Sequence, residues 1–230
     1  MTQNCYQPAG RLVPIFSAHE GLSAASVTYE LSKSAAARGE TVLLLDVIDG
    51  ALMREAGIVV GKTLGDVLYR QADIKDAKYI SHNEHFTAAC AGDATLDALL
   101  GSLAALSLRY DWVFVAAESG CSPAHVNLAS AADTSLLSFS SENDRFMRAY
   151  WMLDAIRARA PKFDPIMLTE GQETEAFEAF ELFKGTVHEF LGAPPALGGI
   201  LEASTDAKAL APMLLETLRE ETRTRKQFAS

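Results

Sequence analysis

Residues 12–26 read LVPIFSAHEGLSAAS, and this stretch decides the fold. It holds a short apolar run, a loop of small residues with one glycine, and the start of an alanine-rich segment. That order is typical of the strand, phosphate loop and helix of a nucleotide-binding α/β protein. No lysine lies between Arg11 and Lys33, so the pattern G-x-x-x-x-G-K-[ST] does not occur. The stretch therefore predicts the frame of a nucleotide switch without the groups that hold ATP.

Apolar runs alternate with helical patterns along the rest of the chain. Residues 41–46, TVLLLD, are almost wholly apolar, as in a central parallel strand that is covered on both faces. They end at Asp46, at the edge where open α/β sheets place their ligands. We expect further strands at 85–90, 112–117, 134–139, 165–168 and 196–201, and helices at 26–38, 64–70, 95–109, 123–131, 143–160, 174–191 and 205–223.

This alternation predicts an α/β fold with a doubly wound, mostly parallel sheet and helices on both faces, as in P-loop NTPases. Four apolar runs should lie side by side and parallel, namely 12–16, 42–45, 112–115 and 136–139. We expect one domain over residues 1–230, with a flexible arm at 1–10 and a C-terminal helix and tail at 205–230.

Composition excludes several classes of protein. With 230 residues, 49% of them hydrophobic, the chain can bury a sizeable core. A formal charge of −10 argues against a broad footprint on nucleic acid. The three cysteines are far apart and predict neither a disulfide framework nor a zinc site. No signal pattern or membrane-length apolar run is present, so we expect a cytoplasmic protein.

The order of segments resembles the MinD/ParA family of deviant Walker ATPases, and most of all its flagellar-number branch, FlhG (also called FleN or YlxH). The resemblance runs from Leu12 to about Leu201. It implies a P-loop fold, ATP with Mg²⁺ as cofactor, and pairing of two chains around the nucleotide. The segments that carry it are ARGETVLLLD (37–46), LGDVLYRQADIKDA (64–77), YDWVFVAAESG (110–120) and AADTSLLSFSSENDRFMRAYWMLDAI (131–156).

The departures from the family pattern cluster in the phosphate loop. His19 stands where the signature lysine reaches across the dimer, and Glu20 and Ser23 replace glycines. Ala24 replaces the Walker lysine, and Ala25 replaces the hydroxyl residue that binds Mg²⁺. Only Gly21 and Ser26 match. The whole degenerate loop comprises Ala18, His19, Glu20, Gly21, Leu22, Ser23, Ala24, Ala25 and Ser26.

The acidic positions of the family are altered as well. By the resemblance, the switch-equivalent positions are Asp46, Asp49 and Ala116. Ala116 replaces the Asp that assists the metal, and Ile48 or its neighbour Asp49 occupies the position of the Asp that positions water. Losing two charge-assisted contacts to phosphate, each about 1.5–3 kcal/mol, weakens affinity by roughly two to four decades. We therefore expect no cofactor, no catalytic residue and no metal ligand, and weak or absent binding of MgATP.

Three functions remain open. The first is a non-catalytic pseudo-ATPase, a regulatory protein of flagellar, cell-pole or division positioning that acts as a homodimer or as a heterodimer with an intact relative. The second is a functional ATP-dependent dimerising switch ATPase of the MinD/FlhG/ParA type. The third is a MinD-like accessory protein of polysaccharide or cellulose synthesis. No tyrosine follows Tyr150, which disfavours the related tyrosine kinases.

The expected partners are proteins, with no nucleic acid among them. The C-terminal helix could contact a membrane surface through Met213, Leu214, Leu215 and Leu218. Its acidic residues Glu216, Glu220 and Glu221 weaken any attraction to anionic lipid.

Overall fold

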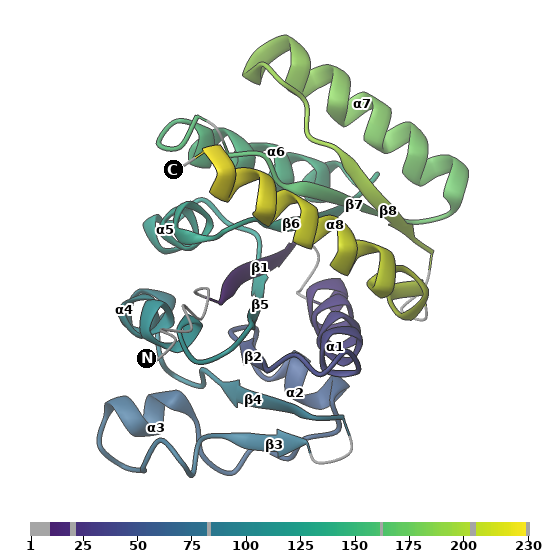
Figure 1. Ribbon diagram of the computed structural model, residues 1–230. Coiled ribbons are helices and arrows are strands. Elements are labelled where there is room, and N and C mark those ends of the chain that lie inside the picture. The colour runs from purple at the N-terminus through teal and green to yellow at the C-terminus, as the bar shows by residue number, and fades with distance from the viewer. Residues whose placement is uncertain (1–9, 19–21, 82–83, 162, 203–205, 229–230) are drawn as a thin grey trace, which may run out of the picture.

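The structure is a computed structural model that describes residues 10–18, 22–81, 84–161, 163–202 and 206–228 (Figure 1). Its strands are β1 (Arg11–Ser17), β2 (Val42–Asp46), β3 (Tyr79–Ser81), β4 (Phe86–Cys90), β5 (Trp112–Glu118), β6 (Leu136–Ser140), β7 (Ile166–Glu170) and β8 (Leu197–Leu201). Its helices are α1 (Leu22–Ala36), α2 (Ala51–Glu55), α3 (Leu64–Leu68), α4 (Leu96–Ser107), α5 (Pro123–Ala131), α6 (Asn143–Arg157), α7 (Glu173–Leu191) and α8 (Asp206–Phe228).

The strands form one sheet in the order β3-β4-β2-β5-β1-β6-β7-β8. The pairing of β3 with β4 is antiparallel, and the other pairings are parallel. The four runs that were predicted to be neighbours form β2, β5, β1 and β6, which lie side by side in this order. Both the doubly wound sheet and its central strands are therefore confirmed.

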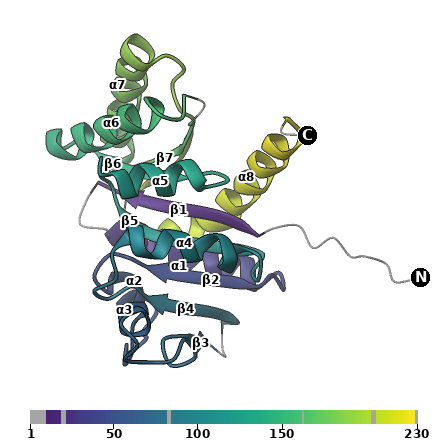
Figure 2. The same ribbon diagram turned by 90° about the vertical axis from the view of Figure 1, so that its left-hand side faces the viewer.

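Helices cover both faces of the sheet because the central strands are apolar on both sides. One buried cluster joins the sheet to α4, α5, α6 and α7, and the other joins it to α1, α2 and α8. Helices α4 and α5 lie on the side that faces the viewer in Figure 2. Within the second cluster the rings of Trp112 and Phe114 stack with their centroids 5.3 Å apart. This layering brings the carboxyl ends of the parallel strands to one edge of the sheet.

Three local predictions need correction. Helix α1 was expected to begin at residue 26, but it begins at Leu22, so that Ser23 lies in its first turn. The five-residue helix α2 was not expected; it follows Gly50, which has a left-handed φ of 76°. The three-residue edge strand β3 was also missed, because its partly exposed residues give no apolar run. The start predicted for the last helix, Thr205, lies outside the described residues.

The C-terminal helix α8 packs beside α1 (Figure 1). Leu214, Leu215 and Leu218 are at most 1% exposed, in the cluster that also contains α1. Arg38, in the turn after α1, pairs with Glu216 of α8, and Arg219 Nη2 lies 2.5 Å from Glu40 Oε2. This packing argues against the membrane contact that the sequence left open, because Leu214, Leu215 and Leu218 are buried in the protein and, of the four apolar residues named for it, only Met213 is exposed.

No helix in the described ranges combines the length and the apolar character that crossing a membrane requires.

Candidate functional site

Four polar side chains meet where β1, β6 and β7 end. Ser17 and Ser138 are each 1% exposed, on neighbouring strands. Ser23, from the first turn of α1, places its Oγ 2.7 Å from Ser17 Oγ and 2.8 Å from Ser138 Oγ. The same Oγ donates a hydrogen bond of 2.5 Å to Glu170 Oε1 at the end of β7. We name Ser17, Ser23, Ser138 and Glu170 the serine–glutamate cluster.

Ser23 is the centre of this cluster. A serine hydroxyl has one hydrogen to donate and two lone pairs to accept with. Because Ser23 donates to the Glu170 carboxylate, its lone pairs are available to the hydroxyls of Ser17 and Ser138. A hydrogen bond to a carboxylate is charge-assisted and stronger than one between neutral groups. The chain thus places a carboxylate of its own against the first turn of α1, where a helix favours an anion.

The alanines of the site face apolar surroundings. Ala24 is fully buried and Ala25 is 2% exposed, and both belong to the apolar cluster between the sheet and α1. Ala116 in β5 is also fully buried, and its register partners are Ile15 in β1 and Asp46 in β2.

The remaining loop residues are only partly described. Ala18 and Ser26 are buried, at 4% and 5% exposure. The backbone N–H of Ala18 donates to the carbonyl of Ser138 at 3.0 Å, which ties the start of the loop to β6. Three predicted site residues, His19, Glu20 and Gly21, lie outside the described residues.

Asp46, at the end of β2, points into the turn that leads to α2. Its carboxylate is fully buried and accepts backbone hydrogen bonds of 2.9 Å from Ile48 and from Met53. Burial raises the pKa of this carboxyl above its ordinary value, and the backbone donors partly oppose the shift. Asp46 therefore organises the local chain.

Asp49, the other predicted switch position, has a different environment. It is exposed, and its φ of 50° lies in the left-handed region, which Asp tolerates better than most residues. Its carbonyl oxygen accepts a hydrogen bond of 2.9 Å from Arg54 Nη1. The two predicted switch residues are thus close in sequence, but one is enclosed and the other faces solvent.

Sequence reasoning missed a serine–histidine pair in the loop after β5. Ser122 caps α5, and its Oγ lies 2.6 Å from His125 Nδ1. A Cβ on Gly120 would lie only 2.8 Å from His125 Cε1, so the glycine leaves room for the imidazole ring in this position. Burial lowers the pKa of His125, against the opposing charges of Glu118 and Asp97. The signal was available in the run S-P-A-H, where Ser precedes a Pro at the first helical position.

In the described part of the chain, no three His, Cys, Asp or Glu side chains are grouped so that they could hold a metal ion.

This architecture is that of MinD/ParA P-loop ATPases. The chain is similar to MinD in the MinC:MinD cell division complex of Aquifex aeolicus (TM-score 0.63, 17% identity, 95% of this chain and 96% of that chain covered). A second similar structure is cobyrinic acid a,c-diamide synthase of Mycobacterium smegmatis with bound ADP and magnesium (TM-score 0.69, 15% identity, 93% and 96% covered). A third is apo McdA of Cyanthece (TM-score 0.67, 15% identity, 96% and 99% covered).

At such low identities the likeness defines the fold. No protein-family description matches the sequence, and no curated protein matches it either.

Proposed function

We propose that this chain is a non-catalytic relative of the MinD/ParA ATPases, a regulatory protein that acts through protein–protein contacts. The observation that carries the proposal is the serine–glutamate cluster, in which Ser23 donates a 2.5 Å hydrogen bond to Glu170 beside the start of α1. A carboxylate at this position repels a phosphate group. It also binds the hydroxyl of the residue that replaces the last glycine of the family loop.

The described residues fit a magnesium nucleotide poorly. Ala24 and Ala25 offer methyl groups, in apolar surroundings, at the positions of the Walker lysine and of the hydroxyl residue that binds magnesium. Ala116 offers no carboxylate at the metal-side position. The Walker lysine, the hydroxyl residue that binds magnesium and the metal-side carboxylate are therefore all replaced by alanine. One substitution could be tolerated in an active site, but the joint loss favours a protein without nucleotide chemistry.

Calorimetric titration of the full chain with MgATP and MgADP tests the proposal directly. We expect no saturation at micromolar nucleotide, because the lost phosphate contacts weaken binding by roughly two to four decades. The double variant Ala24→Lys, Ala25→Thr should remain without ATPase activity, since Ala116 and Glu170 are unchanged. A low-micromolar dissociation constant that requires Mg²⁺ would overturn the proposal.

We propose positioning of flagella, of the cell pole or of the division site as the role, with the FlhG branch as the nearest type and the cytoplasm as the place. The first support is the resemblance of segments in the sequence. The second is the fold shared with MinD and McdA. The MinD neighbour was solved in complex with MinC, which makes a protein partner a natural expectation for this chain.

Pairing is proposed to be independent of nucleotide, either with a second copy or with an intact relative. Light scattering of the purified chain at several concentrations, with and without ATP, tests the homodimer. The proposed dimer should form equally in both conditions and weaken when His19 or Glu20 is replaced by Ala. A dimer that forms only with ATP would instead support a working switch. The solved neighbour with bound ADP and magnesium is the observation that keeps this second candidate open.

A further inference from the structure

A cavity of about 580 Å³ lies between α3 and α4, over β2. It shares no described residue with the serine–glutamate cluster. Small-molecule sites in proteins have volumes of about 300–1,000 Å³. The cavity is therefore large enough for a small organic ligand, and the proposed function does not use it.

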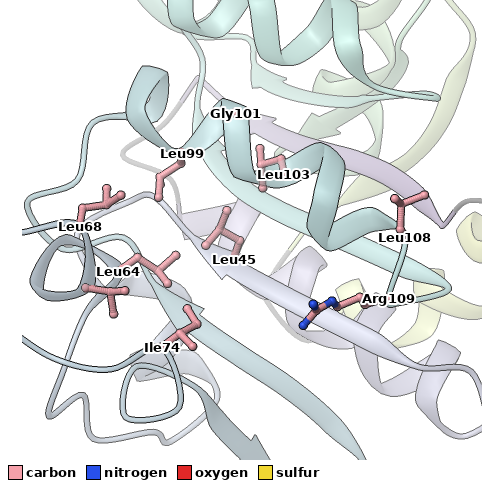
Figure 3. Close-up of a pocket in the computed structure, with 10 residues that line it drawn as sticks. Leu45, Leu64, Leu68, Ile74, Leu99, Gly101, Leu103, Leu108 and Arg109 are labelled. Carbon is pink, nitrogen blue, oxygen red and sulfur yellow. The ribbon is translucent and has the colours of Figure 1, made fainter. Parts of the chain in front are cut away.

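The walls of this cavity are almost wholly apolar. Leu45 of β2 lies at the centre of the lining residues in Figure 3. The side of α3 and its following loop contributes Leu64 and Ile74, and the side of α4 contributes Leu99 and Leu103. A nucleotide or a sugar needs several polar groups around it. Apart from Arg109, the described residues that line this cavity carry no polar side chain, so they favour a hydrocarbon chain.

One charged side chain, Arg109, is among the described residues that line the cavity. It follows α4, and in Figure 3 its guanidinium group lies on the side of the residue that faces the leucines. The described structure gives this guanidinium no carboxylate partner. An arginine without an internal acid is available to an external anion.

We propose that the cavity binds a medium-chain fatty acid, with its hydrocarbon chain between α3 and α4 and its carboxylate on Arg109. The apolar walls take the chain because burial removes its surface from water. The planar guanidinium takes the carboxylate through two parallel hydrogen bonds. Neither feature alone specifies the ligand. Together they select a molecule with a long apolar body and a single anionic end.

Calorimetric titration of the full chain with decanoate, below its micelle concentration, tests the proposal. We expect one saturable site per chain. Methyl decanoate has the same chain without the charge, and it should bind about tenfold more weakly or worse, because both charged hydrogen bonds to Arg109 are lost. Absence of saturable decanoate binding would overturn the proposal, as would equal affinity for acid and ester.

Arg109→Gln separates the role of the charge from that of the walls. It should weaken decanoate about tenfold and leave methyl decanoate unchanged. Arg159→Gln is the matched control, since Arg159 is an exposed arginine in the turn after α6, and it should change neither ligand. If Arg109→Gln bound decanoate like the unaltered chain, the assignment of the carboxylate to Arg109 would be wrong.

Ile74→Trp tests whether the ligand occupies the cavity itself. Ile74 is 48% exposed, so a larger side chain there can be accommodated in the folded protein while it fills the cavity mouth. Decanoate and its methyl ester should both lose binding, and the thermal melting curve should confirm that the variant is folded. A folded Ile74→Trp protein that bound both ligands with unchanged affinity would place them elsewhere and overturn the proposal.

Discussion

The ends of β1 and β2 satisfy their polar groups in opposite ways. Asp46, at the end of β2, is bonded by backbone N–H groups two and seven residues further along the chain. Ser23, in the helix after β1, is bonded by side chains that are six, 115 and 147 residues away in the sequence. The first arrangement can form as soon as its own turn forms. The second exists only when β1, β6 and β7 are assembled.

This difference teaches which of the two strand ends is open to change of function. The Asp46 carboxylate stabilises the backbone of the turn that leads into α2, so its role is structural. The serine–glutamate cluster joins side chains on elements that the sheet already holds in place through backbone pairing. We infer that altering the serine–glutamate cluster lowers the free energy of unfolding less than altering Asp46 does. The following predictions test this difference.

The largest effect is expected for Asp46→Ala. The change leaves the buried N–H groups of Ile48 and Met53 without their acceptor, and each loss costs about 1–3 kcal/mol. The free energy of unfolding should fall by about 2–5 kcal/mol, as measured by urea denaturation. Asp49→Asn is the control: this exposed residue keeps a side chain that tolerates a left-handed backbone, so a change within about 0.5 kcal/mol is expected. Equal losses at both positions would contradict the role given to Asp46.

A smaller effect is expected for Ser23→Ala. The variant removes one hydroxyl, and Glu170 and the two buried serines lose a common partner. Because Glu170 is only partly buried, water can replace part of what is lost, and the unfolding free energy should fall by about 1–2 kcal/mol. The exposed Ser130→Ala in α5 is the control and should shift stability by less than about 0.5 kcal/mol. A loss for Ser23→Ala as large as that for Asp46→Ala would break the comparison.

The smallest effect concerns the third polar loop at this edge, where His125 pairs with Ser122. The folded state lowers the pKa of His125, so the neutral ring contributes stability above about pH 6.5, the ordinary value. That contribution is lost as the pH falls below this value, with a slope of at most about 1.4 kcal/mol per pH unit. His125→Gln should flatten the pH dependence of the unfolding free energy below about pH 6.5. His188→Gln, at an exposed position, should leave it as it is; a flattening of equal size there would show that burial of His125 is not the cause.

The sheet could be predicted from the sequence because its central strands are recognisable as apolar runs. Runs such as 42–46 and 112–117 are apolar on both faces, which excludes a surface helix and favours a buried parallel strand. Helix α2 escaped prediction for the opposite reason. It is five residues long and follows a left-handed glycine and a buried Asp46, whose hydrogen bonds are invisible in a pattern of hydrophobicity.

The candidate site was only half predictable. The loop after β1 could be found from its strand, its small residues and its missing lysine. The partners of Ser23 could not be found, because Ser138 and Glu170 lie on other strands and meet it through the sheet register. That register depends on how separate segments pack, and no local pattern encodes it.

The packing of α8 on α1 has a consequence for folding during synthesis, because the two helices leave the ribosome at very different times. Arg38, in the turn after α1, and its partner Glu216 in α8 are 178 residues apart in the chain. A ribosome therefore releases α1 long before α8, and until then the apolar residues that α1 presents to α8 stay open to water or to a chaperone. Contacts between such distant segments also slow folding, because a long loop must close before they form. The docking of α8 is thus a late step in folding. A chain that terminated before α8 would expose the apolar residues of α1 and would be a target for proteases.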